Sequence, residues 1–358
     1  MRLSFAQLNQ RIHTWLGLLL SLWVLLMAVT GTALYYKPAL LKLTYPVLDT
    51  GAPLSQTAAA VQLDSLPPQL DHGYAYMPTR DAPWLEVVDT ENTRWYYGES
   101  GLLLKREAHS DVIDVFVSLH HDLMLGDTGK DVQGFAGLAS LLLLITGTIL
   151  WWPRHRLSRR HFTIHWFSLK SRKGLQTLAE MHKVSAVIFL LPMVLLLGTG
   201  TAIIYSQPVN SALVGLFPSE GQQPLIPTPA PTAENWQQRL SVAQSLFTNV
   251  SPRLIYLSKD RLRLKHEDEW HPNGRNYIGF DTTSGVLAER EDVRQTAYGN
   301  QLSHTIYPLH VAAVGGVALL AVSTLAGLIL ILLPLTGISY WVKRRRYRPN
   351  AHKKPTAT

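Results

Sequence analysis

Cysteine is absent from all 358 residues of the chain. This absence excludes a structural disulfide, a cysteine-ligated iron–sulfur cluster and the C-x-x-C-H attachment of a c-type haem. The chain also lacks a glycine-rich dinucleotide fingerprint, a Walker A loop and a G-x-S-x-G elbow. It therefore offers no visible nucleotide site, and any redox group must be held without a thioether bond.

Charged residues are also scarce, at 16% of the chain against 47% hydrophobic residues. The hydrophobic residues gather in four runs, which cover Ile12–Tyr36, Gly134–Trp152, Val184–Tyr205 and Val311–Val342. Each run reaches the roughly 20 residues that a helix needs to cross a membrane. We therefore predict four transmembrane helices. The first is expected to be an uncleaved anchor, because its apolar core is longer than that of a signal peptide. The fourth is long enough to project beyond the membrane or to contain a break near Gly315 and Gly316.

Acidic residues are nearly missing from three segments. The N-terminal segment, Pro153–Lys183 and the tail from Lys343 hold 17 of the 33 Lys and Arg residues but only one acid, Glu180. By the positive-inside rule, these segments, and with them both termini, are predicted to face the cytoplasm. The net charge of +8 then reflects helix orientation and contact with lipid headgroups rather than nucleic-acid binding.

One histidine stands at or near the start of each apolar run: His13, His120 or its neighbour His121, His182 and His310. An imidazole beside lipid is costly unless it has a partner, so these residues are candidate ligands. The predicted topology places His13 and His182 near the cytoplasmic face, and His120 and His310 near the external face. Each pair could supply the two axial imidazoles of a b-type haem.

The spacing of these histidines indicates an internal duplication. Thr30-Gly31-Thr32-Ala33 and Thr199-Gly200-Thr201-Ala202 are 169 residues apart, as are His13 and His182. Thr146-Gly147 and Thr336-Gly337 are 190 residues apart, as are His120 and His310, which favours His120 over His121.

The same spacing predicts where the four glycines lie. At 1.5 Å per residue, Gly31 lies about 27 Å along its helix from His13. Gly31 and Gly200 are thus expected beside the external haem, and Gly147 and Gly337 beside the cytoplasmic one. Alternatively, the glycines only allow the helices to pack closely, and the histidines only contact lipid headgroups. One haem or no haem would then be expected.

The segments between the runs have mixed α and β character. Trp84–Val88 and Trp95–Tyr97 in the first segment, and Leu254–Leu257 and Arg261–Lys265 in the second, are predicted strands. We predict a membrane protein that is mainly helical, with four transmembrane helices in two repeated halves and two α+β external domains. The expected order is cytoplasmic N-terminus and first span (1–36), first external domain with the His120 segment (37–130), second span (131–152), basic cytoplasmic loop (153–183), third span (184–206), second external domain (207–307), fourth span (308–342) and basic cytoplasmic tail (343–358).

Several motifs resemble one known family. The Asp-x-x-x-Gly hairpin at Asp281–Leu287 is similar to PepSY modules, and Leu119–Leu123 with the Thr-Gly…Trp-Trp-Pro-Arg of the second span resembles the PepSY-associated transmembrane family. Leu309-His310 and Thr336-Gly337…Trp341 are similar to the closing helix of that family. The resemblance covers nearly the whole chain, and its helix motifs are more specific than its external ones. It implies a bacterial inner-membrane oxidoreductase of the ferric-siderophore reductase type, with haem between the helices.

The functional expectation follows from both arguments. Two b-type haems, on His13/His182 and His120/His310, would carry electrons from a cytoplasmic or quinol donor to a ferric siderophore or similar chelate in the periplasm, releasing Fe(II). Arg11 and Lys183 are candidates to pair with haem propionates. The sequence identifies no residue as catalytic or as a siderophore contact. The alternative is a membrane-anchored PepSY protein for binding, sensing or peptidase inhibition, because PepSY modules also occur in such proteins.

Overall fold

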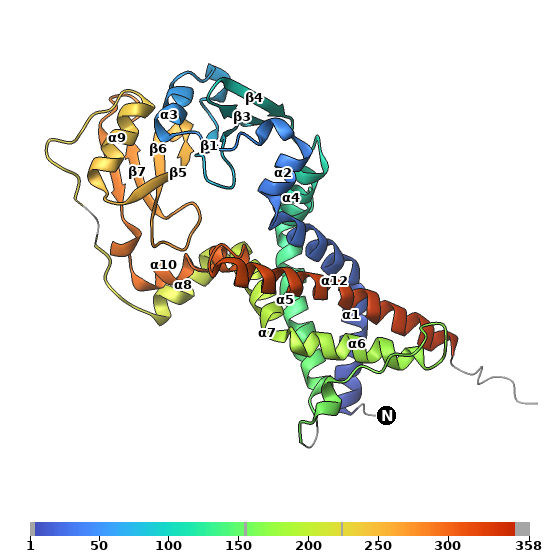
Figure 1. Cartoon of the computed structure of the whole chain (residues 1–358). Coiled ribbons are helices and arrows are strands. Elements are labelled where there is room, and N and C mark those ends of the chain that lie inside the picture. The colour runs from blue at the N-terminus through green and yellow to red at the C-terminus, as the bar shows by residue number, and fades with distance from the viewer. Residues whose placement is uncertain (1–3, 154–155, 223–224, 348–358) are drawn as a thin grey trace, which may run out of the picture. The chain divides into compact units, whose positions relative to one another are not determined.

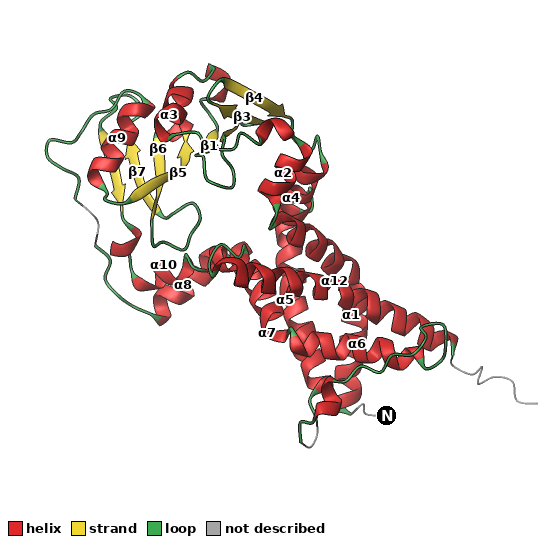
Figure 2. Ribbon diagram, in the orientation of Figure 1, coloured by secondary structure: helices red, strands yellow, loops and turns green. Residues whose placement is uncertain are grey.

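The computed structural model of the chain describes residues 4–153, 156–222 and 225–347. It divides into two compact units. The first, a helical unit, comprises residues 1–32, 119–204 and 317–358, and the second, an external unit, comprises residues 33–118 and 205–316. All the strands of the described residues belong to the external unit, as the colouring by secondary structure makes visible (Figure 2).

Three helices of the helical unit are each long and apolar enough to cross a membrane. They are α1 (Phe5–Leu34), α5 (Gly126–Trp151) and α12 (Gly316–Arg346) (Figure 1). Many of their large apolar side chains are exposed, among them Leu19, Leu22, Phe135 and Val317. Such surfaces suit contact with lipid rather than water. Gly315 and Gly316 both have positive φ, so the fourth apolar run breaks where the sequence predicted, and α12 begins there.

The third predicted span is not one straight helix. It consists of α6 (Gly174–Ile188) and α7 (Leu190–Ile204), which meet at Phe189 with a bend of 69°. Pro192 explains the bend, since a proline has no N–H to donate to the carbonyl four residues earlier. The helix that carries the start of the expected span at 184–206 begins ten residues earlier, at Gly174, and His182 lies within α6. The bent pair counts as a fourth span only if both halves cross the membrane together.

The helices of this unit pack through small residues. A Cβ on Gly137 of α5 would overlap Thr201 Oγ1 of α7, and one on Gly327 of α12 would overlap Thr32 Oγ1 of α1. Because the two glycines are 190 residues apart and the two threonines 169, both crossings repeat the duplication found in the sequence. Glycine at these positions lets the helix backbones approach closely.

The external unit contains one antiparallel sheet of eight strands, in the order β4-β3-β2-β1-β5-β6-β7-β8. The first segment supplies β1 (Tyr74–Tyr76), β2 (Leu85–Val88), β3 (Arg94–Gly98) and β4 (Gly101–Arg106), and the second supplies β5 (Val250–Tyr256), β6 (Arg261–His266), β7 (Asn276–Phe280) and β8 (Leu287–Glu291). The halves join where Ala75 of β1 pairs with Ile255 of β5. The two segments that the sequence assigned to separate domains thus share one sheet.

One face of this sheet packs against α3 (Gln56–Asp64) and α9 (Trp236–Leu246), which also contact one another. Each helix begins at a polar N-cap: Ser55 accepts a hydrogen bond from Ala58 N, and Asn235 accepts one from Gln238 N. The core between helices and sheet contains Leu63 of α3 and Leu240 of α9, and apolar side chains of the strands that include Ile255, Leu262, Leu264 and Ile278.

Shorter helices complete the external unit. They are α2 (Lys37–Thr44), α4 (Val112–Asp122), α8 (Ser206–Leu216), α10 (Tyr298–Ser303) and α11 (Ile306–His310), of which α8 and α10 pack side by side. Single 3-10 turns lie at Pro46–Leu48, Pro68–Leu70, Arg159–Phe162, Leu257–Lys259 and Val293–Gln295. The last four residues of α4, from Leu119, belong to the helical unit.

Candidate functional site

Two of the predicted ligand histidines lie beside one another in the helical unit. His13 on α1 and His182 on α6 have ring centres 6.3 Å apart, with their planes at 83°. The two residues are 169 positions apart in the sequence, so only the packing of α6 against its neighbours brings them together. Both rings are partly buried among the helices.

The hydrogen bonds of these rings fix which nitrogen carries the proton. His182 Nδ1 lies 3.0 Å from the Leu333 carbonyl oxygen and 3.2 Å from Thr336 Oγ1. A carbonyl can only accept, so Nδ1 of His182 must be the donor. His13 Nδ1 lies 3.1 Å from Thr146 Oγ1, and that hydroxyl donates its proton to the Leu143 carbonyl. In each neutral ring the lone pair is consequently on Nε2, the nitrogen left for a metal.

A glycine stands beside each of these rings. A Cβ on Gly147 would lie 2.9 Å from His13 Cε1, and one on Gly337 would lie 3.4 Å from His182 Cε1. The predicted grouping of these glycines with these histidines agrees with this geometry. The contact itself differs from the expectation, because the glycine makes room for the imidazole rather than for the face of a macrocycle.

His120 repeats this arrangement with a different helix. Its Nδ1 lies 3.1 Å from Thr30 Oγ1, which donates to the Leu26 carbonyl, and a Cβ on Gly31 would lie 2.6 Å from its Cε1. His121 is exposed. The geometry therefore supports His120 over His121 as the residue that faces α1.

The predicted partner of His120 belongs to the other unit. His310 ends α11 in the external unit, where its backbone carbonyl accepts a hydrogen bond from the Tyr35 hydroxyl. Gly200 lies in α7 of the helical unit. The pairing of His120 with His310, and the place of Gly200 near them, stay predictions from the sequence.

The separation of His13 and His182 suits two ligands of one metal ion. Imidazoles that bind a metal from opposite sides at about 2 Å each have ring centres roughly 6 Å apart. Among the described residues, no three or more His, Asp or Glu side chains gather in a metal-binding arrangement. The two imidazoles could therefore serve as two ligands of one metal centre.

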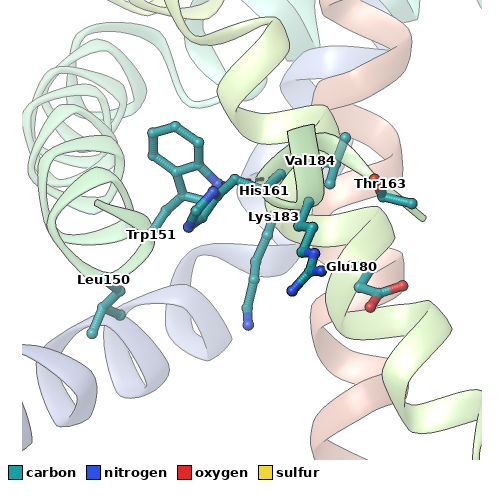
Figure 3. Close-up of a pocket in the computed structure, with 8 residues that line it drawn as sticks. Leu150, Trp151, His161, Thr163, Glu180, Lys183 and Val184 are labelled. Carbon is teal, nitrogen blue, oxygen red and sulfur yellow. Dashed lines mark hydrogen bonds between the residues drawn. The ribbon is translucent and has the colours of Figure 1, made fainter. Parts of the chain in front are cut away.

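A pocket of about 240 Å³ lies beside α6. It is lined by Leu150, Trp151, Arg160, His161, Thr163, Glu180, Lys183 and Val184. Figure 3 shows Trp151 and His161 next to one another, with Lys183 extending from α6. The Glu180 carboxylate accepts a hydrogen bond of 2.6 Å from the backbone N–H of His165. Among the described residues neither Arg160 nor Lys183 forms an ion pair with a carboxylate, so the pocket presents two cations to an anionic group.

The structure places the two predicted propionate partners differently. Lys183 lines the pocket beside α6, whereas Arg11 is exposed on α1 and does not line it. Arg160 and the three threonines Thr30, Thr146 and Thr336 were not predicted as site residues. The threonines had a signal in the sequence, since each directly precedes one of the repeated glycines. Arg160 had none, because nothing distinguishes it from the other basic residues of its segment.

The protein is a helical membrane protein with an internal duplication and an attached β-sheet unit. Its apolar helices, the eight-stranded sheet to which both halves contribute, and the histidine pair of the helical unit all fit this class. The family described as the PepSY-associated TM region matches residues 10–344. Because the match covers nearly the whole chain, the protein belongs to this family, as its Leu-His and Thr-Gly motifs had indicated. No curated protein matched the chain.

Proposed function

We propose that this protein carries electrons across a bacterial inner membrane to a ferric chelate, such as a ferric siderophore, on the periplasmic side. The proposal rests mainly on the His13–His182 pair, whose spacing and tautomers suit two axial ligands. When bound, a bis-histidine b-type haem supplies a one-electron carrier with no open iron position, which suits electron transfer rather than oxygen activation.

Different residues of the chain would bind the haem, orient its ligands and pair with its propionates. His13 and His182 would bind through Nε2, while Thr146, Thr336 and the Leu333 carbonyl hold their Nδ1–H groups and orient the rings. Lys183 and Arg160, in the pocket beside α6, would pair with propionates. The second haem, on His120 and His310, rests on the duplication. The electron donor is a cytoplasmic reductant or a membrane quinol.

The test is the colour and haem content of the purified protein. The full chain in detergent should show a Soret band and an α band that sharpens with dithionite, and a pyridine haemochrome assay should give two haems per chain. Replacing His182→Ala should leave one haem per chain, because the second pair is on other helices. His72→Ala is the control, since His72 is an exposed histidine of the external unit. A folded but colourless protein would refute electron transfer and favour a membrane-anchored binding or regulatory role.

A further inference from the structure

A buried arginine in the external unit has no carboxylate partner. Arg263 of β6 lies between Leu262 and Leu264, whose side chains enter the core beneath α3 and α9, so it points to the opposite face of the sheet. Its side chain is buried, with 7% of the residue exposed. Arg263 Nε donates to the Gly274 carbonyl at 2.7 Å, and Nη2 lies 3.2 Å from the His271 ring nitrogens.

Elsewhere in the external unit, three buried or half-buried arginines are paired with carboxylates. Arg94 pairs with Glu86 at 2.5 Å, Arg106 with Asp111 at 2.6 Å, and Arg239 with Asp260 at 2.6 Å. Burying an unpaired charge is costly. Among the ion pairs of the described residues, none includes Arg263 or its neighbour Arg275. Of the three most buried arginines of the described residues, Arg106, Arg239 and Arg263, only Arg263 has no ion pair with a carboxylate, which makes it a candidate to bind an anionic ligand.

The groups around Arg263 are donors and cations. His271 stacks on the Tyr307 ring at 5.0 Å, with the ring planes 18° apart. Burial, together with the charges of Arg275 and Arg263, lowers the pKa of His271 to about 2 and that of His304 to about 4. Both rings are thus neutral at physiological pH and able to donate one N–H each.

The nearest acids do not neutralise the cluster. Glu269 is close enough to Arg263, and Glu291 to Arg275, for the arginines to lower their pKa values, but burial raises both above the ordinary value for a glutamate. Neither carboxylate lies within ion-pair distance of an arginine of the cluster. Glu269 instead accepts hydrogen bonds from Asn276 and from the His266 backbone. Lys265 adds a further cation nearby.

We propose that Arg263, Arg275, His271 and His304 form a binding site for a carboxylate group of an anionic ligand. Guanidinium groups bind carboxylates in a planar, two-bonded geometry, and the neutral imidazoles add N–H donors. The stacked Tyr307 lies on α11, one helical turn before His310. The carboxylate belongs either to a ferric hydroxycarboxylate chelate or to a haem propionate, and assigning it to the chelate rests on the proposed function.

The experiment measures binding of gallium(III) citrate, a redox-inert analogue of a ferric hydroxycarboxylate chelate, to the purified full chain in detergent by calorimetry. Arg275→Gln and His304→Gln should each weaken binding, Arg275→Gln by about 10- to 100-fold, because a charge-assisted hydrogen bond is lost. Arg294→Gln is the control: it removes one positive charge from the same unit, at an exposed arginine paired with Asp268. Circular dichroism checks that each variant folds. If Arg275→Gln does not fold, His304→Gln alone provides the test.

Haem content and reduction midpoint, measured on the same samples, separate the two sources. Weaker gallium citrate binding with an unchanged midpoint supports a chelate site. Unchanged gallium citrate binding with a shifted midpoint or lost haem supports a propionate site. If neither property changes in Arg275→Gln and His304→Gln, the proposal is wrong. Since gallium is not reduced, a colourless protein that binds gallium citrate would refute electron transfer and leave this site standing.

Discussion

At the scale of single residues, His13, His120 and His182 of the helical unit each face a threonine on another helix. Thr30 faces His120, Thr146 faces His13, and Thr336 faces His182. In each case the threonine hydroxyl donates its hydrogen bond to a carbonyl of its own helix, so its oxygen must accept one from the imidazole N–H. An imidazole held in this way is already oriented before any metal binds, so less conformational entropy is lost on binding.

Removing one of these hydroxyls should change the reduction potential of the haem that we propose on His13 and His182. Thr146→Val takes away an acceptor from His13 Nδ1–H and makes the imidazole a poorer electron donor to ferric iron. The midpoint potential should therefore rise, as a redox titration followed at the α band would show. Thr148→Val is the matched control, because the Thr148 hydroxyl bonds only to the Leu144 carbonyl in the same helix. An equal rise in both variants would contradict an orienting role for Thr146.

A second residue-scale prediction concerns acid sensitivity of the external unit. His304 has a pKa of about 4 in the folded chain and about 6.5 when unfolded. The unfolded chain thus binds more protons between these values, so stability is complete above about pH 6.5 and falls as the pH drops toward 4. The loss should be on the order of 3 kcal/mol. Thermal unfolding of the full chain at pH 7 and pH 4.5 should show a smaller difference for His304→Gln than for wild type. Equal differences would show that His304 is not desolvated.

At the scale of elements, the two glycine–threonine crossings set how closely the helices approach. Gly137→Ala should force α5 and α7 apart or turn Thr201 away, which overpacking studies suggest costs about 1 to 3 kcal/mol. In the double variant Gly137→Ala with Thr201→Ala, the offending hydroxyl is gone and most of the stability should return. A double-mutant cycle of thermal unfolding measures this coupling. Additive losses would mean that the two residues do not touch.

The sequence predicted some elements better than others, for physical reasons. Long apolar runs and the alternating strand patterns carry local signals, so α1, α5, α12 and strands such as β2 and β6 appeared where expected. The bend between α6 and α7 was missed, although Pro192 was a readable sign of it. The pairing of β1 with β5 joins residues about 180 positions apart and depends on packing in space, so no local pattern could reveal it.

At the scale of the whole molecule, the duplication extends to nearly every element. Helix α1 corresponds to the bent pair α6 and α7, α2 to α8, α3 to α9, the strands β1–β4 to β5–β8, α4 to α10 and α11, and α5 to α12. The eight-stranded sheet is symmetric about the contact of β1 with β5, since each half follows the same order outward. The repeated spacing of histidines and glycines in the sequence was the visible part of this relation. The family match over residues 10–344 encompasses both halves.

The orientation of the whole chain is open to a direct test, because a protein without cysteine gives no background in thiol labelling. Ser100→Cys places a thiol in the exposed turn between β3 and β4, and Lys170→Cys places one in the exposed loop before α6. From the distribution of basic residues, a membrane-impermeant maleimide should label Ser100→Cys in spheroplasts and label Lys170→Cys only after the membrane is opened. The reverse pattern would put the His13–His182 pair at the periplasmic face. It would then be the site nearer a periplasmic chelate, and electrons would pass from the His120–His310 pair to the His13–His182 pair rather than the reverse.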